Sequence, residues 1–145
     1  LVKTEIWAQS LIEIIKNLSE NAEKSIDEEF AALSDAAKRS EDAHFVKQIE
    51  TRKSDAASGA YIRERRSFLA AITTFCSQIY LIACGADISD IPNPEMFSGI
   101  TLPEKISPER AAKILKEAEE LDYTLHFNVN DELALRTFAV NLAMS

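Results

Sequence analysis

The chain has 145 residues, of which 46% are hydrophobic and 28% charged, a composition typical of a globular domain that needs no disulfide or metal to hold its core. Its net charge of −8 argues against strong binding to nucleic acid, because phosphate affinity comes mainly from Lys and Arg, and it favours neutral or basic partners. Three glycines and four prolines leave long stretches without helix breakers, so we predict an all-α fold of about five helices.

Several whole-chain features predict a cytoplasmic protein. Cys76 and Cys84 are eight residues apart, which is about 12 Å along a helix and too far for a disulfide within one straight helix. We therefore expect both to be reduced core residues. The sequence shows no signal peptide and no apolar run long enough to cross a membrane. It begins at Leu1 instead of Met, so we expect it to be part of a longer chain.

The first helix is predicted over residues 4–19, with Thr4 as its N-cap. The polar stretch 17–25 is interpreted as a frayed end of this helix or as a connection. Large apolar side chains at helical spacing form the expected buried stripe of the helix, namely Trp7, Leu11, Ile14, Ile15 and Leu18.

Residues 26–58 form a highly charged segment with few apolar side chains. Those side chains still fit helical spacing, although the pattern weakens between Ala37 and Phe45. A helix with so thin an apolar seam packs against one neighbour only, or forms half of a helical hairpin. A single glycine costs a helix only about 1 kcal/mol. Because no proline or capping signal lies nearby, we expect the helix to continue through Gly59.

The stretch 61–87 is expected to form the helix around which the rest of the chain packs. A helix that is apolar around so much of its surface is normally covered on several sides, by its own domain or by a partner subunit. Gly85 is the expected left-handed residue that ends it. The apolar side chains recur every three or four residues, at Phe68, Ile72, Phe75, Ile79 and Ile82.

A proline-rich loop follows over residues 87–107. It carries several large apolar side chains between its prolines, so we expect it to be pinned to the core, with a short helical turn at 94–97.

Two helices are predicted after this loop. Ser107 and Pro108 mark the N-cap and first position of a helix that ends near His126. Asn130 is the expected N-cap of the last helix. The connection at 128–130 is short, which predicts that the two helices pack as an antiparallel pair.

One residue pair is compatible with catalysis. Arg39 and His44 form an R-x4-H pattern, which helical nucleases of the HEPN type use on a scissile phosphate. Glu41 and Asp42 would repel a phosphate, and such a pair arises easily by chance in a charged segment. The basic cluster of Arg63, Arg65 and Arg66 is interpreted as a solvated or salt-bridged helix face, with contact to a phosphate or an acidic partner as the alternative.

Other signatures of chemistry are missing from the sequence. The histidines and cysteines match no metal-ligand spacing, and three scattered glycines leave no phosphate-binding loop. We therefore predict no metal, no cofactor and no catalytic residue.

Four motifs follow one another in the second half of the chain: RERRSFLAAITTFCSQIYLIACGAD, IPNPEM, SPERAAKILKEAEELDYTL and NVNDELALRTFAVNLA. Their order resembles the C-terminal collar domain of a bacterial DNA polymerase III clamp-loader subunit, most closely δ′. In that family an apolar helix closes in a Gly-Ala-Asp-like turn, and the last helix begins with Asn-Val-Asn-Pro and continues with Leu-Ala-Leu. Residues 128–130 and 133–135 match, whereas Asp131 stands where Pro is usual. Residues 26–58 resemble a charged insertion that some δ′ subunits carry.

The resemblance implies one helical domain over residues 1–145, a bundle of the collar type with a long charged helical hairpin. Residues 1–25 would hold the first helix and a connection, 26–58 the charged insertion and 59–145 the collar core. Collar domains pack side by side into a ring. That ring holds together the five-subunit AAA+ assembly that loads the sliding clamp for the DNA polymerase III holoenzyme. The AAA+ modules would precede Leu1.

The expected function is therefore non-catalytic oligomerisation, with δ and τ/γ-like subunits as partners, no membrane and no strong direct binding of nucleic acid. Two alternatives stay open: a HEPN-like nuclease using Arg39 and His44, and a helical adaptor that binds a partner through residues 26–58. The sequence does not separate δ′ from τ/γ. The candidate interface residues are the apolar anchors of two helices, Phe68, Ile72, Phe75, Ile79, Leu135 and Phe138.

Overall fold

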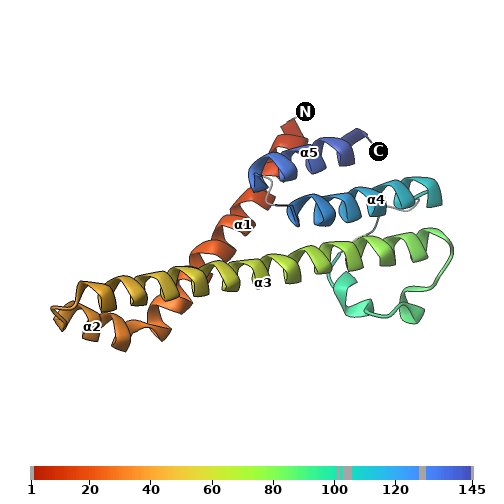
Figure 1. Ribbon diagram of the computed structural model, residues 1–145. Helices are drawn as coiled ribbons and strands as arrows, with labels where there is room; N and C mark the ends of the chain where they lie inside the picture. The colour runs from red at the N-terminus through yellow and green to blue at the C-terminus, as the bar shows by residue number, and fades with distance from the viewer. Residues whose placement is uncertain (1, 101, 103–105, 128–129, 145) are drawn as a thin grey trace. The chain divides into compact units, whose positions relative to one another are not determined.

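The computed structural model describes residues 2–100, 102, 106–127 and 130–144, and these contain helices but no strand (Figure 1). The predicted all-α class is confirmed. The elements in chain order are α1 (Val2–Glu29), α2 (Ala31–Arg39), α3 (Ala43–Ala83), the short 3-10 helices η1 (Ile88–Asp90) and η2 (Pro94–Phe97), α4 (Pro108–Leu125) and α5 (Asp131–Met144).

Contacts divide the chain into two compact units. Unit 1 comprises Leu1–Ile12 and Phe68–Ser145, and unit 2 comprises Glu13–Ser67, so that α1 and α3 each contribute residues to both. The predicted subdivision into 1–25, 26–58 and 59–145 stays a prediction.

Helix α1 is longer than predicted, because it continues without a break through the polar stretch 17–25. The expected stripe also needs correction: the side chains of Trp7 and Ile14 are 51% and 39% exposed. The buried residues of α1 are instead Ala8, Ile15, Ala22 and Ile26, at spacings of seven, seven and four. The alanines among these buried residues let a neighbouring helix approach α1 closely. The bulkier side chains of Trp7 and Ile14 are therefore left at the margin of the contact.

The charged segment 26–58 is interrupted where its apolar pattern weakens. Helix α2 ends at Arg39, the chain turns over residues 40–42, and α3 begins at Ala43. The turn is held by short polar side chains: Ser40 Oγ accepts from the Asp42 backbone N–H at 3.1 Å, and Asp42 Oδ1 accepts from the His44 N–H at 2.9 Å. Asp42 thus satisfies a free donor in the first turn of α3, as an N-cap does.

Helix α3 runs through Gly59, as predicted, and ends where Gly85 was expected to stop it. Gly85 has φ +104°, and its N–H donates to the Ile82 carbonyl at 2.9 Å. The Ala86 N–H donates to the Leu81 carbonyl at 3.0 Å. This pair of bonds is a Schellman motif, which satisfies carbonyls left open at the helix end.

The two cysteines differ in their surroundings, although both are free thiols. Cys76 lies in the core, where burial raises the pKa of its thiol to about 11. Cys84 is exposed, which corrects the prediction that both are core residues. It lies one residue beyond the last helical residue of α3, where the chain turns toward solvent.

A buried glutamine holds the proline-rich loop against α3. Gln78 is 1% exposed; its Oε1 accepts from the Asn93 N–H at 2.9 Å, and its Nε2 donates to Met96 Sδ at 3.0 Å. Beside it, the rings of Phe75 and Phe97 stack with centroids 5.0 Å apart. The predictions of a pinned loop and of a helical turn at 94–97 are both confirmed.

Helices α4 and α5 pack side by side within unit 1 (Figure 1). Their starts are capped as predicted: Ser107 Oγ accepts from the Arg110 N–H at 3.2 Å, and Asn130 Oδ1 accepts from the Leu133 N–H at 3.0 Å. Asn141 Nδ2 near the end of α5 donates to Glu117 Oε2 in the middle of α4 at 2.7 Å. Residues 128 and 129 lie outside the described residues.

Candidate subunit interface

The four interface candidates on α3 are half-buried residues of unit 1. Phe68, Ile72, Phe75 and Ile79 fall on one face of the helix, and none of them is fully buried or fully exposed. Phe75 is already covered in part by the ring of Phe97. Each of these side chains therefore keeps some apolar surface that further packing would cover.

The two candidates on α5 lie in the core of unit 1. Leu135 is 0% exposed and Phe138 is buried beside it, together with Ala134 and Ala139. Their side chains pack inside their own unit in this structure, and their assignment to a subunit interface stays a prediction.

The opposite face of α5 carries apolar side chains that sequence reasoning missed. Leu133 is 61% exposed, Val140 47% and Met144 81%, and Thr137 lies between them. The spacings of four, three and four residues place all four on one line along the helix, which we call the outer stripe of α5. The spacing of the outer stripe is visible in the sequence. The face with Leu135 and Phe138 is also apolar there, so the sequence alone does not tell which of the two faces is buried.

Charged residues border the outer stripe on both of its sides, with Glu117 and Glu120 of α4 beside Thr137 and Asn141, and Arg136 on the other side. Arg136 forms ion pairs with Glu5 of α1 and with Glu132 one helical turn earlier. The hydrogen bond to Glu5 and then the one to Glu132 raise the pKa of Arg136, so this guanidinium stays charged. The network ties the beginning of α1 to α5 within unit 1.

A further exposed apolar group lies at the end of α4. The rings of Tyr123 and Phe127 meet edge to face with centroids 4.8 Å apart, and the two side chains are 69% and 62% exposed. Paired aromatic rings that remain in solvent are common at contact surfaces, because they offer large rigid area with little entropy to lose.

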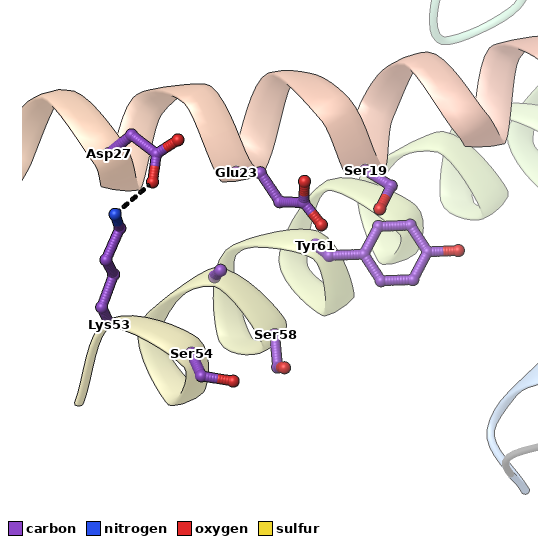
Figure 2. A pocket seen from close by; sticks show the side chains of 8 residues that line it. Ser19, Glu23, Asp27, Lys53, Ser54, Ser58 and Tyr61 are labelled. Atoms are coloured by element: carbon purple, nitrogen blue, oxygen red, sulfur yellow. Dashed lines mark ion pairs between the residues drawn. The ribbon is translucent and has the colours of Figure 1, made fainter. Parts of the chain in front are cut away.

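Unit 2 contains a groove between α1 and α3, with a volume of about 360 Å³. Figure 2 shows Ser19 and Glu23 of α1 pointing toward Tyr61 of α3, and Ser54 and Ser58 of α3 also line the groove. At one end, Lys53 Nζ approaches Asp27 Oδ1 at 2.7 Å, which neutralises that carboxylate (Figure 2). The groove therefore offers hydroxyl groups and the carboxylate of Glu23.

The nuclease candidates stand apart from this groove. Arg39 is the last residue of α2 and His44 lies in the first turn of α3, and both side chains are exposed. The Arg39 Nε donates to the Asp35 carbonyl at 3.3 Å, so the guanidinium folds back along its own helix. The carboxylate of Asp42 lies at the N–H of His44.

Metal and membrane criteria give two further results. Among the described residues, no group of three or more His, Cys, Asp or Glu side chains is arranged to hold a metal ion. Helix α3 is long and apolar enough, over one 18-residue window, to meet the length and composition criterion for a membrane span. This differs from the expectation that no such stretch exists, although a core helix of a soluble protein passes the same test.

Comparisons with protein-family models, with curated proteins and with solved structures found no match for this chain.

Proposed function

We propose that the chain is a non-catalytic assembly domain, whose role is to hold subunits together through helix faces. The observation that carries this proposal is the two-sided apolar character of α5. One face of α5 fills the core of unit 1 with Leu135 and Phe138, and the other presents Leu133, Val140 and Met144 to solvent. A surface helix normally has one polar face, and one that is apolar on both is typically covered by a second body.

Helix α3 supports the same proposal. Its most apolar 18-residue window is only 17% buried within the structure. Several large side chains of this part of α3 are covered only in part, so apolar surface remains that a second body would cover. The half-buried Phe68, Ile72 and Ile79 belong to this surface.

The particular assembly we propose is the collar of a clamp loader of the DNA polymerase III type, with this chain as a δ′-like subunit. Support comes from the motif order in the second half of the chain and from its helix boundaries. The Gly85 stop, the Ser107 cap and the Asn130 cap fall where the motifs require a helix to end or begin. In this proposal the charged segment 26–58 is the insertion, the partners are δ and τ/γ-like collars, and the location is the cytoplasm.

Co-purification with these subunits tests the proposal. The whole gene that encodes this segment is expressed with δ and τ/γ subunits, beside a copy lacking residues 1–145 and a copy with Val140→Lys. We expect the deletion to abolish the pentamer and Val140→Lys to weaken it. Leu33→Lys changes a 46% exposed leucine on α2 of unit 2 and is the matched control, which should leave the pentamer unchanged. A pentamer that forms equally well without residues 1–145 would overturn the proposal.

A helical adaptor is the second candidate, and one observation favours it. Residues 13–67 form a compact unit of their own, and Leu33 in that unit is exposed. An adaptor that binds through residues 26–58 predicts the reverse pattern in the same experiment, with partner capture lost on Leu33→Lys and kept on Val140→Lys.

A further inference from the structure

We infer that Met96 is an oxidation site, and that its conversion to the sulfoxide releases the proline-rich loop from α3. The loop is joined to α3 by an uncommon hydrogen bond, in which Nε2 of the buried Gln78 donates to Met96 Sδ at 3.0 Å. Met96 itself is half-buried, so its side chain lies at the margin of the core. Both residues belong to unit 1, so the contact is independent of any partner subunit.

The orientation of the Gln78 amide is fixed by a second bond. Its Oε1 accepts from the Asn93 N–H at 2.9 Å, and a backbone N–H can only donate, so the atom that faces Asn93 is the oxygen. The amide nitrogen therefore faces Met96, whose thioether sulfur has lone pairs to accept a hydrogen bond and no hydrogen to donate. The Thr74 carbonyl lies 3.5 Å from the same nitrogen, which is long for an N–H···O bond, so Met96 is the closer partner.

The contacts with α3 are gathered on one short turn of the loop. Helix η2 spans Pro94–Phe97 and follows Asn93, and the Met96 N–H donates to the Asn93 carbonyl at 3.1 Å. The ring of Phe97 stacks on Phe75 of α3, with centroids 5.0 Å apart. Because the turn is bonded to itself, a displacement of Met96 from Gln78 also shifts Asn93 and Phe97.

The oxidation is a balanced two-electron step with hydrogen peroxide as the oxidant. One peroxide oxygen bonds to Met96 Sδ, the O–O bond breaks, and the other oxygen leaves as water with both hydrogens. The thioether is oxidised to a sulfoxide while the peroxide is reduced. Methionine sulfoxide reductases reverse the change, with one enzyme for each of the two sulfoxide epimers.

The geometry around Sδ explains why the sulfoxide loosens the loop. Nε2 lies 3.0 Å from Sδ, which leaves no room for an oxygen between the two atoms, so an oxygen added on that side requires Met96 to withdraw from Gln78. An oxygen added on the other side makes the sulfur a poorer acceptor and places a polar group in a half-buried site. Either epimer therefore weakens the contact, and Gln78, which is 1% exposed, loses a partner.

Release of the turn would enlarge the apolar surface of α3. Phe75 is half-buried with Phe97 stacked on it, so it would become more exposed when the loop leaves. The same face of the helix carries the half-buried Phe68, Ile72 and Ile79. Oxidation of Met96 would thus couple peroxide to the amount of apolar surface that α3 exposes.

The other sulfur-containing residues differ from Met96 in their exposure. Cys76 is buried, and burial raises the pKa of its thiol to about 11, so the thiolate with which peroxide reacts is scarce. Cys84 is exposed, and Cys84→Ser removes its thiol from the experiment. Met144 is 81% exposed at the end of the outer stripe, so it should oxidise faster than Met96 without loosening the loop. It is therefore the internal control.

Peroxide treatment of the Cys84→Ser chain tests the inference, with oxidation followed by mass spectrometry and amide hydrogen exchange by NMR. We expect the sulfoxide first at Met144 and then at Met96. Once Met96 is oxidised, the Asn93 amide should exchange about tenfold faster or more, with α4 and α5 unchanged. Methionine sulfoxide reductases for both epimers should restore slow exchange. Met96→Leu cannot be oxidised, so its exchange should not respond to peroxide, whereas Met144→Leu should respond as fully as the Cys84→Ser chain.

Three results would each overturn the inference. In the first, Met96 stays reduced in the folded chain while Met144 is fully oxidised, which would show that its sulfur is inaccessible. In the second, Met96 is fully oxidised and the Asn93 amide still exchanges slowly, because the sulfoxide oxygen accepts from Gln78 with the turn in place. In the third, exchange in α4 and α5 accelerates as much as in the loop, which would show general unfolding instead of loop release.

Discussion

The interiors of the two units of this molecule are stabilised by different side chains. Unit 1 encloses large side chains completely: Leu125 and Leu135 are 1% and 0% exposed, and Gln78 bonds the proline-rich loop to α3. Unit 2 buries only alanine and isoleucine side chains. These are Ile15, Ala22, Ile26, Ala37 and Ile49.

The difference follows from composition. Residues 26–58 are rich in charge, so the helices of unit 2 have few apolar residues to bury. Their polar link, the Lys53–Asp27 ion pair, has side chains that are 34% and 61% exposed, and such pairs contribute about 0–1 kcal/mol. Unit 2 should therefore open more easily than unit 1, which makes it the more adaptable part of the molecule.

The largest expected effect comes from truncating the core of unit 1. Leu135→Ala should lower the free energy of unfolding by about 2–5 kcal/mol, because it removes buried methyl groups and leaves a cavity. Urea unfolding followed by circular dichroism measures this loss. Leu133→Ala is the matched control two residues away on the exposed face, and it should change the free energy by less than about 0.5 kcal/mol at low protein concentration. Equal losses from the two variants would show that the two faces of α5 are assigned wrongly.

Truncating the seam of unit 2 should have a local effect. Ile49 is 4% exposed, so Ile49→Ala should lower the stability of unit 2 by about 2–4 kcal/mol and leave α4 and α5 protected. Native-state hydrogen exchange measures this as faster exchange of amides in α2 and in the first part of α3. Leu33→Ala in the same unit is the exposed control and should leave exchange nearly unchanged. If exchange in α4 and α5 accelerates as much as in unit 2, the two units unfold together and the contrast between them fails.

The parts of the fold that the sequence predicted well are those set by local chemistry. Ser107 and Asn130 cap helices because their side-chain oxygens reach backbone N–H groups two or three residues on, and this depends on nothing distant. Gly85 adopts a positive φ that few other residues tolerate, so it marked a helix end correctly. The continuity of α3 through Gly59 is predictable for a similar reason, since one glycine costs less than the surrounding helix gains.

The features of the fold that the sequence did not predict depend on which neighbouring element each helix face packs against. Ala8 and Ala22 are buried in α1, whereas the hydrophobicity of the sequence predicted that Trp7 and Ile14 would be buried. On α5, periodicity alone does not tell the Leu135 face from the Leu133 face, because both are apolar. The burial of Gln78 was also missed, since its partners lie 15 and 18 positions away in an irregular loop.

Gln78 provides the smallest of the expected effects, and it shows whether the order of unit 1 depends on polar contacts as well as on apolar burial. Gln78→Met keeps the volume of the side chain but removes the acceptor for the Asn93 N–H and the donor to Met96. An amide N–H left without a partner in a part-buried site costs about 1–3 kcal/mol, so we expect a loss of that size in the free energy of unfolding. We also expect faster hydrogen exchange of the Asn93 amide and easier proteolysis within residues 87–100. Ser77→Ala is the neighbouring control, since it removes only a hydroxyl that donates to the Thr74 carbonyl within α3 and should cost less than about 0.5 kcal/mol. If Gln78→Met keeps full stability and protects the loop equally well, then the apolar contacts of Ile91 and Phe97 alone hold the loop.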